Sequence, residues 1–181
     1  TAAYFIRVGG CDVGCHWCDV KESWNADLHP PTAVESIITN AKKYAETIVI
    51  TGGEPLTWNM NPITAQLKNA GLNVHIETSG AFWQEIPLLA WITLSPKHHL
   101  SPSYPVQELF WMRANEIKFV ISTGQELEFY KDYLLTVQDC PIFLQPEWNV
   151  RDRAISIILE LLQQNPNYRL SLQTHKYIGV A

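Results

Sequence analysis

Short apolar, β-rich runs alternate with helical patterns along this whole chain. The runs lie at residues 3–10, 47–51, 73–78, 90–94, 116–122, 141–144 and 169–173. Because two parallel strands can be joined only through a crossover, which is usually a helix, the alternation predicts right-handed βαβ units and a parallel sheet.

The helical patterns carry their own boundary signals. Helices are expected at residues 32–44, 61–70, 124–137 and 152–164, and residues 103–113 look partly helical. Thr32 and Glu35 have the spacing of a capping box, and Pro62 and Gly71 bracket the second helix. The last helix is expected to bury one apolar face, made of Ala154, Ile155, Ile158, Leu161 and Leu162.

The number of units limits the fold. The chain has 181 residues, of which 46% are apolar, enough for a single domain spanning residues 1–181. A complete barrel of eight units takes about 250 residues. We therefore predict an α/β fold, namely an incomplete (β/α) barrel of about six parallel strands with flanking helices. An open doubly wound sheet is the alternative.

Charge and hydropathy exclude some functions. A formal net charge of −5 argues against nucleic acid as the main partner, because phosphate binding needs a dense basic face. No run approaches the roughly 20 apolar residues of a membrane helix, and no secretory signal precedes the first strand. Clustered cysteines suit metal binding in a reducing compartment, so we expect a cytoplasmic protein without a membrane partner.

Polar residues gather where the predicted strands end. Arg7 lies in the first strand, and the later strands are followed or ended by Thr51, Gly53, Glu77, Ser95, Lys97, Gln145 and His175. Polar residues also mark strand ends for purely structural reasons. Their recurrence in successive units nevertheless predicts a site at the carboxyl edge of the sheet, where such folds place their chemistry.

Three cysteines, Cys11, Cys15 and Cys18, form a CxxxCxxC motif directly after the first strand. Thiolates suit zinc, copper(I) or an iron–sulfur cluster. A structural zinc would need a fourth ligand, such as Cys140 or a distant histidine. Three cysteines can instead hold three irons of a 4Fe–4S cluster and leave the fourth iron open to a ligand that is not protein. S-adenosylmethionine (SAM) is such a ligand in radical enzymes.

A glycine-rich motif strengthens this interpretation. The sequence TGGEP follows the second strand, and Trp17 precedes the last cysteine of the motif. Gly52 and Gly53 would let backbone approach a ligand closely, although a Gly-Gly turn also occurs for structural reasons.

These motifs give the chain a resemblance to the radical SAM superfamily, and within it to the 7-carboxy-7-deazaguanine synthase family. The matching segments are FIRVGGC, CHWCD, TGGEP, ETSG, LSPK, EIKFVIS, LQPEWN and SLQTHKYIG. Members convert 6-carboxy-5,6,7,8-tetrahydropterin to 7-carboxy-7-deazaguanine with loss of ammonia, in the biosynthesis of queuosine and other 7-deazapurines. Mg²⁺ assists this reaction, and SAM is regenerated.

The resemblance assigns roles to individual residues. It implies a 4Fe–4S cluster on Cys11, Cys15 and Cys18. It implies SAM contacts from Trp17, Asp19, Gly53, Glu77, Ser95, Lys97 and Gln145, and substrate contacts from Arg7, Thr51 and His175. Structural alternatives are a surface ion pair for Arg7, an ion pair between Glu77 and Lys97, and a core position for His175.

The chain departs from the family pattern in three places. Val20 stands where the family usually has a hydroxyl residue that ligates Mg²⁺, so either Asp19, water and substrate hold the ion or the protein needs it less. The family's leading segment, rich in Gly, Gln and Glu, has no counterpart before Thr1. Ala181 stands where members often carry proline.

The expected partners follow from the same resemblance: a small pterin substrate, an electron donor of the flavodoxin or ferredoxin type, and a second copy in a homodimer. Two other functions are alternatives. One is a radical SAM activase of a glycyl-radical enzyme, and the other is a zinc-stabilised binding module without enzymatic activity.

Overall fold

The structure is a computed structural model that describes residues 2–137 and 139–179. The chain forms two compact units, Thr1–Ala114 and Asn115–Ala181. Ala181 lies outside the described residues. That residues 1–181 form a single domain stays a prediction.

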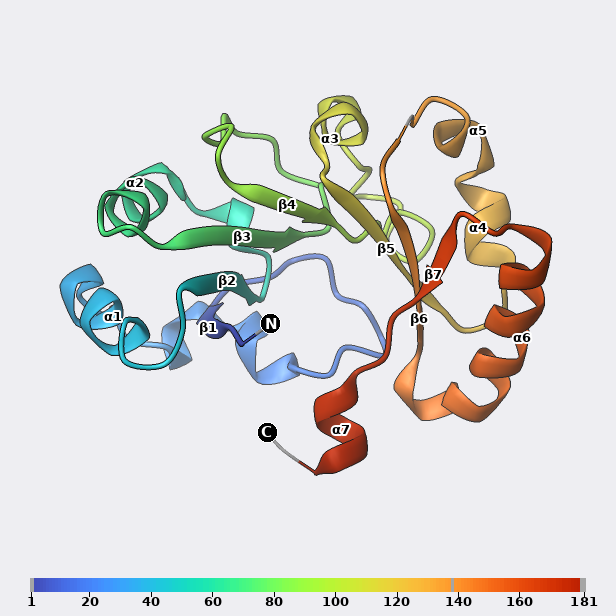
Figure 1. The fold of residues 1–181 in the computed structure, drawn as a ribbon, viewed down its shortest axis with the longest axis horizontal. Helices are drawn as coiled ribbons and strands as arrows, with labels where there is room; N and C mark the ends of the chain where they lie inside the picture. Colours follow the sequence, from blue (N-terminus) through green and yellow to red (C-terminus); the bar gives the residue numbers. More distant parts are fainter. Residues whose placement is uncertain (1, 138, 180–181) are drawn as a thin grey trace. The chain divides into compact units, whose positions relative to one another are not determined.

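The first unit is built on four parallel strands in chain order. These are β1 (Tyr4–Val8), β2 (Thr47–Gly52), β3 (Asn73–Thr78) and β4 (Trp91–Leu94). The helices α1 (Val34–Ala41), α2 (Asn61–Asn69) and α3 (Glu108–Arg113) connect or follow them, and α1 and α2 lie beside each other (Figure 1). The carboxyl ends of the four strands therefore lie at one edge of this sheet.

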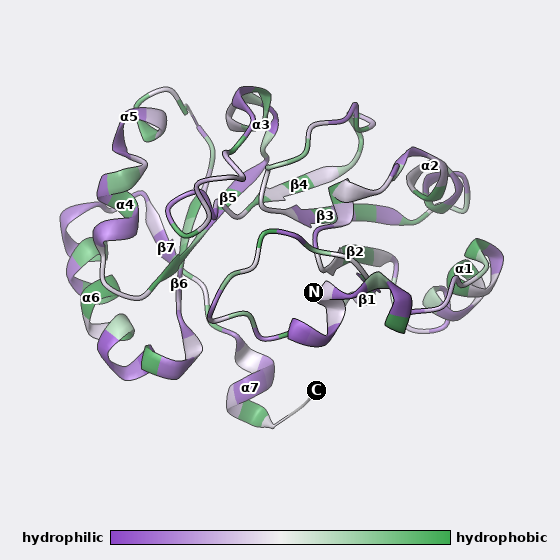
Figure 2. Ribbon diagram, turned by 180° about the vertical axis from the view of Figure 1, so that it is seen from behind, coloured by the Kyte–Doolittle hydropathy of each residue, from purple (hydrophilic) through white to green (hydrophobic). Residues whose placement is uncertain are grey.

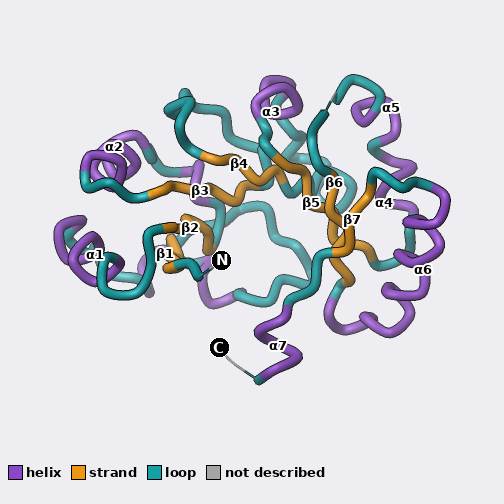
Figure 3. Tube along the Cα trace, viewed as in Figure 1, coloured by secondary structure: helices purple, strands orange, loops and turns teal. Residues whose placement is uncertain are grey.

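The segment that joins β1 to α1 is mostly loop (Figure 3) and contains the cysteine motif. Two short 3₁₀ helices interrupt it, η1 (Lys21–Trp24) and η2 (Ala26–Leu28). A third, η3 (Pro55–Thr57), follows β2 directly and packs against β2 and β3.

The two faces of this sheet differ in burial. One face is largely apolar, and on β2, β3 and β4 it is fully buried at Ile48, Ile50, Ile76, Ile92 and Leu94. The other face is partly open: it carries Phe5, Arg7, Val49, Thr51, His75, Glu77 and Trp91. Because side chains alternate along a strand, the polar set shares a face by register and not by chance.

The second unit has three parallel strands in chain order, β5 (Glu116–Ile121), β6 (Ile142–Pro146) and β7 (Tyr168–Leu170). Its helices are α4 (Gln125–Phe129), α5 (Lys131–Leu134), α6 (Arg151–Gln164) and α7 (Thr174–Ile178), with the 3₁₀ helix η4 (Trp148–Val150) before α6. Hydrophobic and hydrophilic residues alternate along α6 (Figure 2). Ala154 and Ile158 are fully buried there, as the predicted apolar face requires.

The predicted α/β class with parallel strands and flanking helices is confirmed, with seven described strands instead of about six. Among the described strand pairs, neither the strands β1–β4 nor the strands β5–β7 close into a barrel. Within the part of the chain that the structure describes, no helix is both long and apolar enough to cross a bilayer.

Several predicted boundaries were wrong. Helix α1 begins after Ala33, whose side chain cannot cap it, so Thr32 and Glu35 form no capping box. The helix expected at 124–137 is two short helices that meet at Tyr130, and only 108–113 of the stretch 103–113 is helical. The last strand ends at Leu170, and α7 follows it.

Candidate active site at the strand ends

The predicted substrate contacts of the first unit lie on the open face of its sheet. Arg7 is the register partner of Thr51 on the neighbouring strand, and its side chain is exposed. Val49 pairs with His75, which places Thr51 and Glu77, each two residues further on, on this same face. The cation of Arg7, the hydroxyl of Thr51 and the carboxylate of Glu77 thus lie on the adjacent strands β1, β2 and β3.

The cysteine loop is closed at its base by backbone hydrogen bonds. The N–H of Gly10 donates to the carbonyl of Ser23 at 2.7 Å, and that of Cys11 donates to Trp24 at 3.2 Å. Within the loop the N–H of Cys18 donates to the carbonyl of Cys15 at 2.9 Å. The three thiols therefore belong to one folded loop and not to an extended connection.

The Gly52–Gly53 turn after β2 packs against the backbone at the start of the cysteine loop. The N–H of Gly53 donates to Val8 at 2.8 Å, and that of Glu54 donates to Gly10 at 2.9 Å. A Cβ on Gly53 would lie 2.1 Å from the carbonyl oxygen of Gly10, and one on Gly52 would lie 2.3 Å from the backbone nitrogen of Val8. The glycines are therefore required by the contact of two backbone segments, before any ligand is considered.

Glu54 joins the ends of β2 and β3. It is buried, and its Oε1 accepts from the hydroxyl of Thr78 at 2.7 Å and from the N–H of Leu56 at 3.1 Å. Its Oε2 accepts from the N–H and the hydroxyl of Ser79 at 2.7 and 2.6 Å. Four donors around a buried carboxylate compensate the cost of removing its charge from water.

Three predicted SAM contacts come together after β4. The ammonium of Lys97 donates to the carbonyl and the hydroxyl of Ser95, both at 2.6 Å. The same ammonium lies 5.5 Å from the ring centroid of Trp17, within cation–π distance. The segment after β4 thus contacts the loop that carries the cysteines.

Burial governs the protonation of the thiols. It raises the pKa of Cys11, and the nearby carboxylate of Glu54 adds to this effect. Burial also raises the pKa of Cys15, while the positive charge of Lys97 acts to lower it. In the absence of a metal these thiols hold their protons, so binding of a metal would release protons from them.

The donor set fits an iron–sulfur cluster. All four cysteines are thiols, and the charge of Cys18 acts on both Cys11 and Cys15. Among the residues that the structure describes, no three His, Cys, Asp or Glu side chains converge as ligands of one metal ion. Soft thiolates on one loop suit an iron–sulfur cluster, in which each cysteine binds a different iron.

Asp19 and Val20 continue the loop after the last cysteine. Asp19 is exposed, and Val20 is half-buried just before η1. The backbone carbonyl of Val20 accepts from the hydroxyl of Ser23 at 2.7 Å and from its N–H at 2.9 Å. This carbonyl is used within the fold, and the side chain at position 20 offers no ligand atom.

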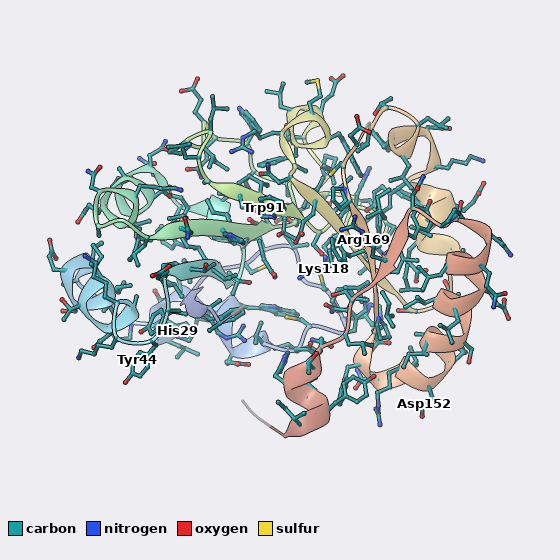
Figure 4. All side chains as sticks on the ribbon, in the orientation of Figure 1. His29, Tyr44, Trp91, Lys118, Asp152 and Arg169 are labelled. Atoms are coloured by element: carbon teal, nitrogen blue, oxygen red, sulfur yellow. The ribbon has the colours of Figure 1, made fainter. Side chains whose placement is uncertain are left out.

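The second unit holds the two remaining predicted residues. Gln145 lies on β6, two residues beyond Phe143, and therefore on the same face. Lys118 and Arg169 (labelled in Figure 4) are the register partners of Phe143 on either side, so two basic side chains flank Phe143 on this face, with Glu116 two residues before Lys118. His175 lies in the first turn of α7 and is exposed, which excludes the alternative of a buried core histidine.

The sequence interpretation gave no role to two polar residues of this region. One is Glu54, whose carboxylate binds β3. The other is Ser101, whose hydroxyl donates to the carbonyl of Val13 in the cysteine loop. The glutamate was visible within TGGEP, but nothing in the sequence marked a serine 88 residues away from its partner.

Comparison with known proteins gives consistent relatives. Residues 5–90 match the model of the Radical SAM superfamily. The chain is 48% identical to the 7-carboxy-7-deazaguanine synthase of Flavobacterium psychrophilum, over 99% of this chain and 84% of the relative. It is 41% identical to the 7-carboxy-7-deazaguanine synthase of a Synechocystis species, over 98% of this chain and 84% of that relative.

A solved structure is also similar. The crystal structure of QueE from Escherichia coli matches with a TM-score of 0.80 and 32% sequence identity, and the match covers 94% of this chain and 85% of that chain. The likeness therefore includes both compact units and not the cysteine loop alone.

Proposed function

Since this chain belongs to the 7-carboxy-7-deazaguanine synthase family of the radical SAM superfamily, we propose that it converts 6-carboxy-5,6,7,8-tetrahydropterin to 7-carboxy-7-deazaguanine with loss of ammonia. It is thus a radical SAM carbon–nitrogen lyase. The reaction would serve queuosine or another 7-deazapurine. The relatives named above carry the synthase name, which favours this function over a glycyl-radical activase or a zinc-stabilised module.

The observation that carries the proposal is the position of the cysteine loop. Its base is bonded to the Gly-Gly turn after β2, and Lys97 from the end of β4 lies over its Trp17. Three thiols are thereby held beside the polar ends of parallel strands, where such folds bind their ligands.

The cofactors are a 4Fe–4S cluster held by Cys11, Cys15 and Cys18, and SAM. When bound, they together supply a radical that abstracts hydrogen from substrate. The protein's part is to orient SAM through Trp17, Asp19, Gly53, Glu77, Ser95, Lys97 and Gln145. In this assignment Ser95 keeps the ammonium of Lys97 in place.

Arg7 would hold the carboxylate of the substrate. A guanidinium presents a planar pair of donors that matches a carboxylate, and Arg7 is exposed on the open face of the sheet. Thr51, its register partner, would contribute a hydroxyl, and His175 a further contact.

We also propose Mg²⁺ as a cofactor, bound here with one protein ligand fewer than in the family. Mg²⁺ prefers oxygen ligands, and Val20 supplies none from its side chain. The ion would be held by Asp19, water and substrate.

The proposed partners are a flavodoxin- or ferredoxin-type reductant and a second copy of the chain in a homodimer. A reducing compartment such as the cytoplasm would keep the thiols available for iron.

Anaerobic reconstitution with iron and sulfide, followed by reduction with dithionite and incubation with SAM and the carboxytetrahydropterin, tests the proposal. The expected product is 7-carboxy-7-deazaguanine, with one ammonia per turnover. Formation of 5′-deoxyadenosine without the deazaguanine would contradict the substrate. A colourless protein with one zinc and no acid-labile sulfide would contradict the cluster.

A further inference from the structure

The turn that follows β4 contacts both halves of the cysteine motif. Ser101 donates its hydroxyl hydrogen to the carbonyl of Val13, which lies between Cys11 and Cys15. Lys97 lies over Trp17, which lies between Cys15 and Cys18. One segment thus holds both spacers of the motif.

This turn is a well-defined piece of structure. The N–H groups of Leu100 and Ser101 donate to the carbonyl of Lys97 at 2.9 and 3.0 Å, and the N–H of Tyr104 donates to Ser101 at 2.9 Å. The turn is attached to the sheet where the N–H of Ser95 donates to Thr78 at 2.7 Å. The turn that carries Ser101 is therefore anchored to the sheet as well as to the cysteine loop.

The carbonyl that Ser101 contacts belongs to the peptide unit between Val13 and Gly14 in the cysteine loop. Val13 is buried, so its carbonyl needs a partner. The N–H of Gly14 is in the same planar peptide unit as this carbonyl, and a trans peptide directs the two in opposite directions. Fixing the carbonyl on Ser101 therefore fixes the direction of the Gly14 N–H.

The same peptide unit acts on Cys11. Backbone hydrogen bonding from Val13 and Gly14 lowers the pKa of the Cys11 thiol, against the larger and opposite effect of burial. The Ser101 hydroxyl therefore contacts a peptide unit that interacts with the Cys11 thiol. Gly14 has a φ of +69°, a conformation that glycine adopts without strain.

We propose that Ser101 is a positioning residue for the cluster: its hydroxyl orients the Val13–Gly14 peptide so that the Gly14 N–H donates to the sulfur of Cys11. The inference rests on the proposed function, because it requires Cys11 to be a cluster ligand. Hydrogen bonds to cluster sulfurs help to set the reduction potential, because they stabilise the more negative, reduced state.

The test compares Ser101→Ala and Ser101→Val with Ser101→Thr, which keeps the hydroxyl and matches valine in shape. Ser103→Ala, an exposed serine of the same turn, is the matched control. Each full-length protein is reconstituted anaerobically, and its iron and sulfide are counted. Release of iron to a chelator and the midpoint potential of the cluster, followed by electron paramagnetic resonance, are then measured.

We expect the alanine and valine variants to release iron roughly three- to tenfold faster, the factor that corresponds to one net hydrogen bond. Their midpoint potentials should be more negative than that of the wild type. The threonine variant and Ser103→Ala should behave like the wild type. Unchanged potentials and release rates in both Ser101→Ala and Ser101→Val would overturn the inference.

A second measurement separates this inference from the proposed function. If even the wild type binds no iron and sulfide, the proposed function fails, and amide hydrogen exchange of the iron-free protein still tests the positioning contact. Exchange at Val13 and Gly14 should be faster in Ser101→Ala than in the wild type or Ser103→Ala. Equal exchange would contradict the contact itself.

Discussion

The carboxylate of Glu54 accepts two hydrogen bonds from Ser79, one from its N–H at 2.7 Å and one from its hydroxyl at 2.6 Å. Glu54 directly follows the Gly-Gly turn, and Ser79 directly follows β3. The backbone N–H of Glu54 also donates to Gly10 at the base of the cysteine loop. The glutamate therefore connects the end of β3, through its buried side chain, to the base of the cysteine loop, through its backbone N–H.

Replacing Glu54 by glutamine should destabilise the first unit. The amide keeps the shape and one acceptor oxygen, but its NH₂ group cannot accept from Ser79. One charged hydrogen bond contributes about 1.5–3 kcal/mol, so losing the pair on Oε2 should lower the free energy of unfolding by about 3–6 kcal/mol. Urea unfolding of the iron-free protein, followed by circular dichroism, measures this.

The matched control is Glu128→Gln, since Glu128 forms an exposed ion pair with Lys131. An exposed pair contributes little, so the midpoint of unfolding should stay at its wild-type value. Equal destabilisation by the two variants would show that the buried network around Glu54 has no special role.

Gly53→Ala should impair cluster binding through the backbone. Its methyl group would lie 2.1 Å from the carbonyl oxygen of Gly10, so the turn or the base of the cysteine loop must move. We expect fewer irons per chain after reconstitution and a lower melting temperature. Gly71→Ala is the control, because its left-handed φ of +82° adds strain but nothing lies within 4 Å. A loss of iron in Gly71→Ala as large as in Gly53→Ala would contradict the steric cause.

Arg7→Ala should weaken binding of the carboxypterin more than binding of SAM. Losing a charge-assisted contact to a carboxylate costs about 1.5–3 kcal/mol, which is roughly a ten- to hundredfold rise in the dissociation constant. Arg7→Lys should recover only part of the affinity, because the ammonium lacks the planar pair of donors. Isothermal titration of reconstituted protein with each ligand measures both affinities, and Lys42→Ala, at an exposed lysine directly after α1, is the control. Unchanged affinity for the pterin would remove Arg7 from the site.

The sequence was sufficient for the positions of the strands and for their parallel arrangement, and several candidate site residues of the first unit lie on one face of its sheet. Strand positions follow from local apolar runs, and a parallel arrangement then brings residues such as Arg7 and Thr51 side by side. Motif residues next to strand ends, such as Lys97, are likewise positioned by the strand that precedes them.

Long-range polar contacts could not be predicted in this way. The bonds from Glu54 to Ser79 and from Ser101 to Val13 depend on how loops fold over the sheet, which no periodicity reports. The predicted start of helix α1 was also wrong. Thr32 has the residue type and spacing of a cap, but Ala33 takes the N-cap position and α1 begins at Val34.

Cys140 should react with alkylating agents only at high pH. Burial, with a smaller effect of Glu116, raises the pKa of its thiol from 9.0 to about 11. The thiolate is the nucleophile, so below pH 9 its reaction should be about a hundredfold slower than that of an ordinary thiol. Iodoacetamide labelling from pH 7 to pH 11, with mass spectrometry of the Cys140 peptide, measures the profile.

The raised pKa of Cys140 also determines how the stability of the protein changes with pH. Because the folded pKa of Cys140 lies above the unfolded value, its contribution to stability is complete below pH 9 and is lost as the pH rises towards 11. Labelling in urea should show the ordinary pKa. A folded profile that coincides with the profile in urea would contradict the effect of burial.

Val20→Thr should increase the response to Mg²⁺. Threonine has the shape of valine and adds the hydroxyl that the family usually has at this position, whereas the backbone carbonyl of residue 20 keeps its bonds from Ser23. We expect the variant to reach half-maximal activity at a lower Mg²⁺ concentration than the wild type. The half-buried hydroxyl should cost about 1 kcal/mol of stability or less if it is solvated or bound to the ion.

The measurement is the rate of deazaguanine formation against Mg²⁺ concentration, at saturating SAM and pterin. Val8→Thr is the matched control, because Val8 is a half-buried valine inside β1, outside the position where the family binds the ion. An equal Mg²⁺ response in the wild type and Val20→Thr would show that the ion, if it binds, needs no ligand from position 20. A wild type that is fully active in EDTA while the variant is stimulated by Mg²⁺ would show that this chain dispenses with the ion because of Val20.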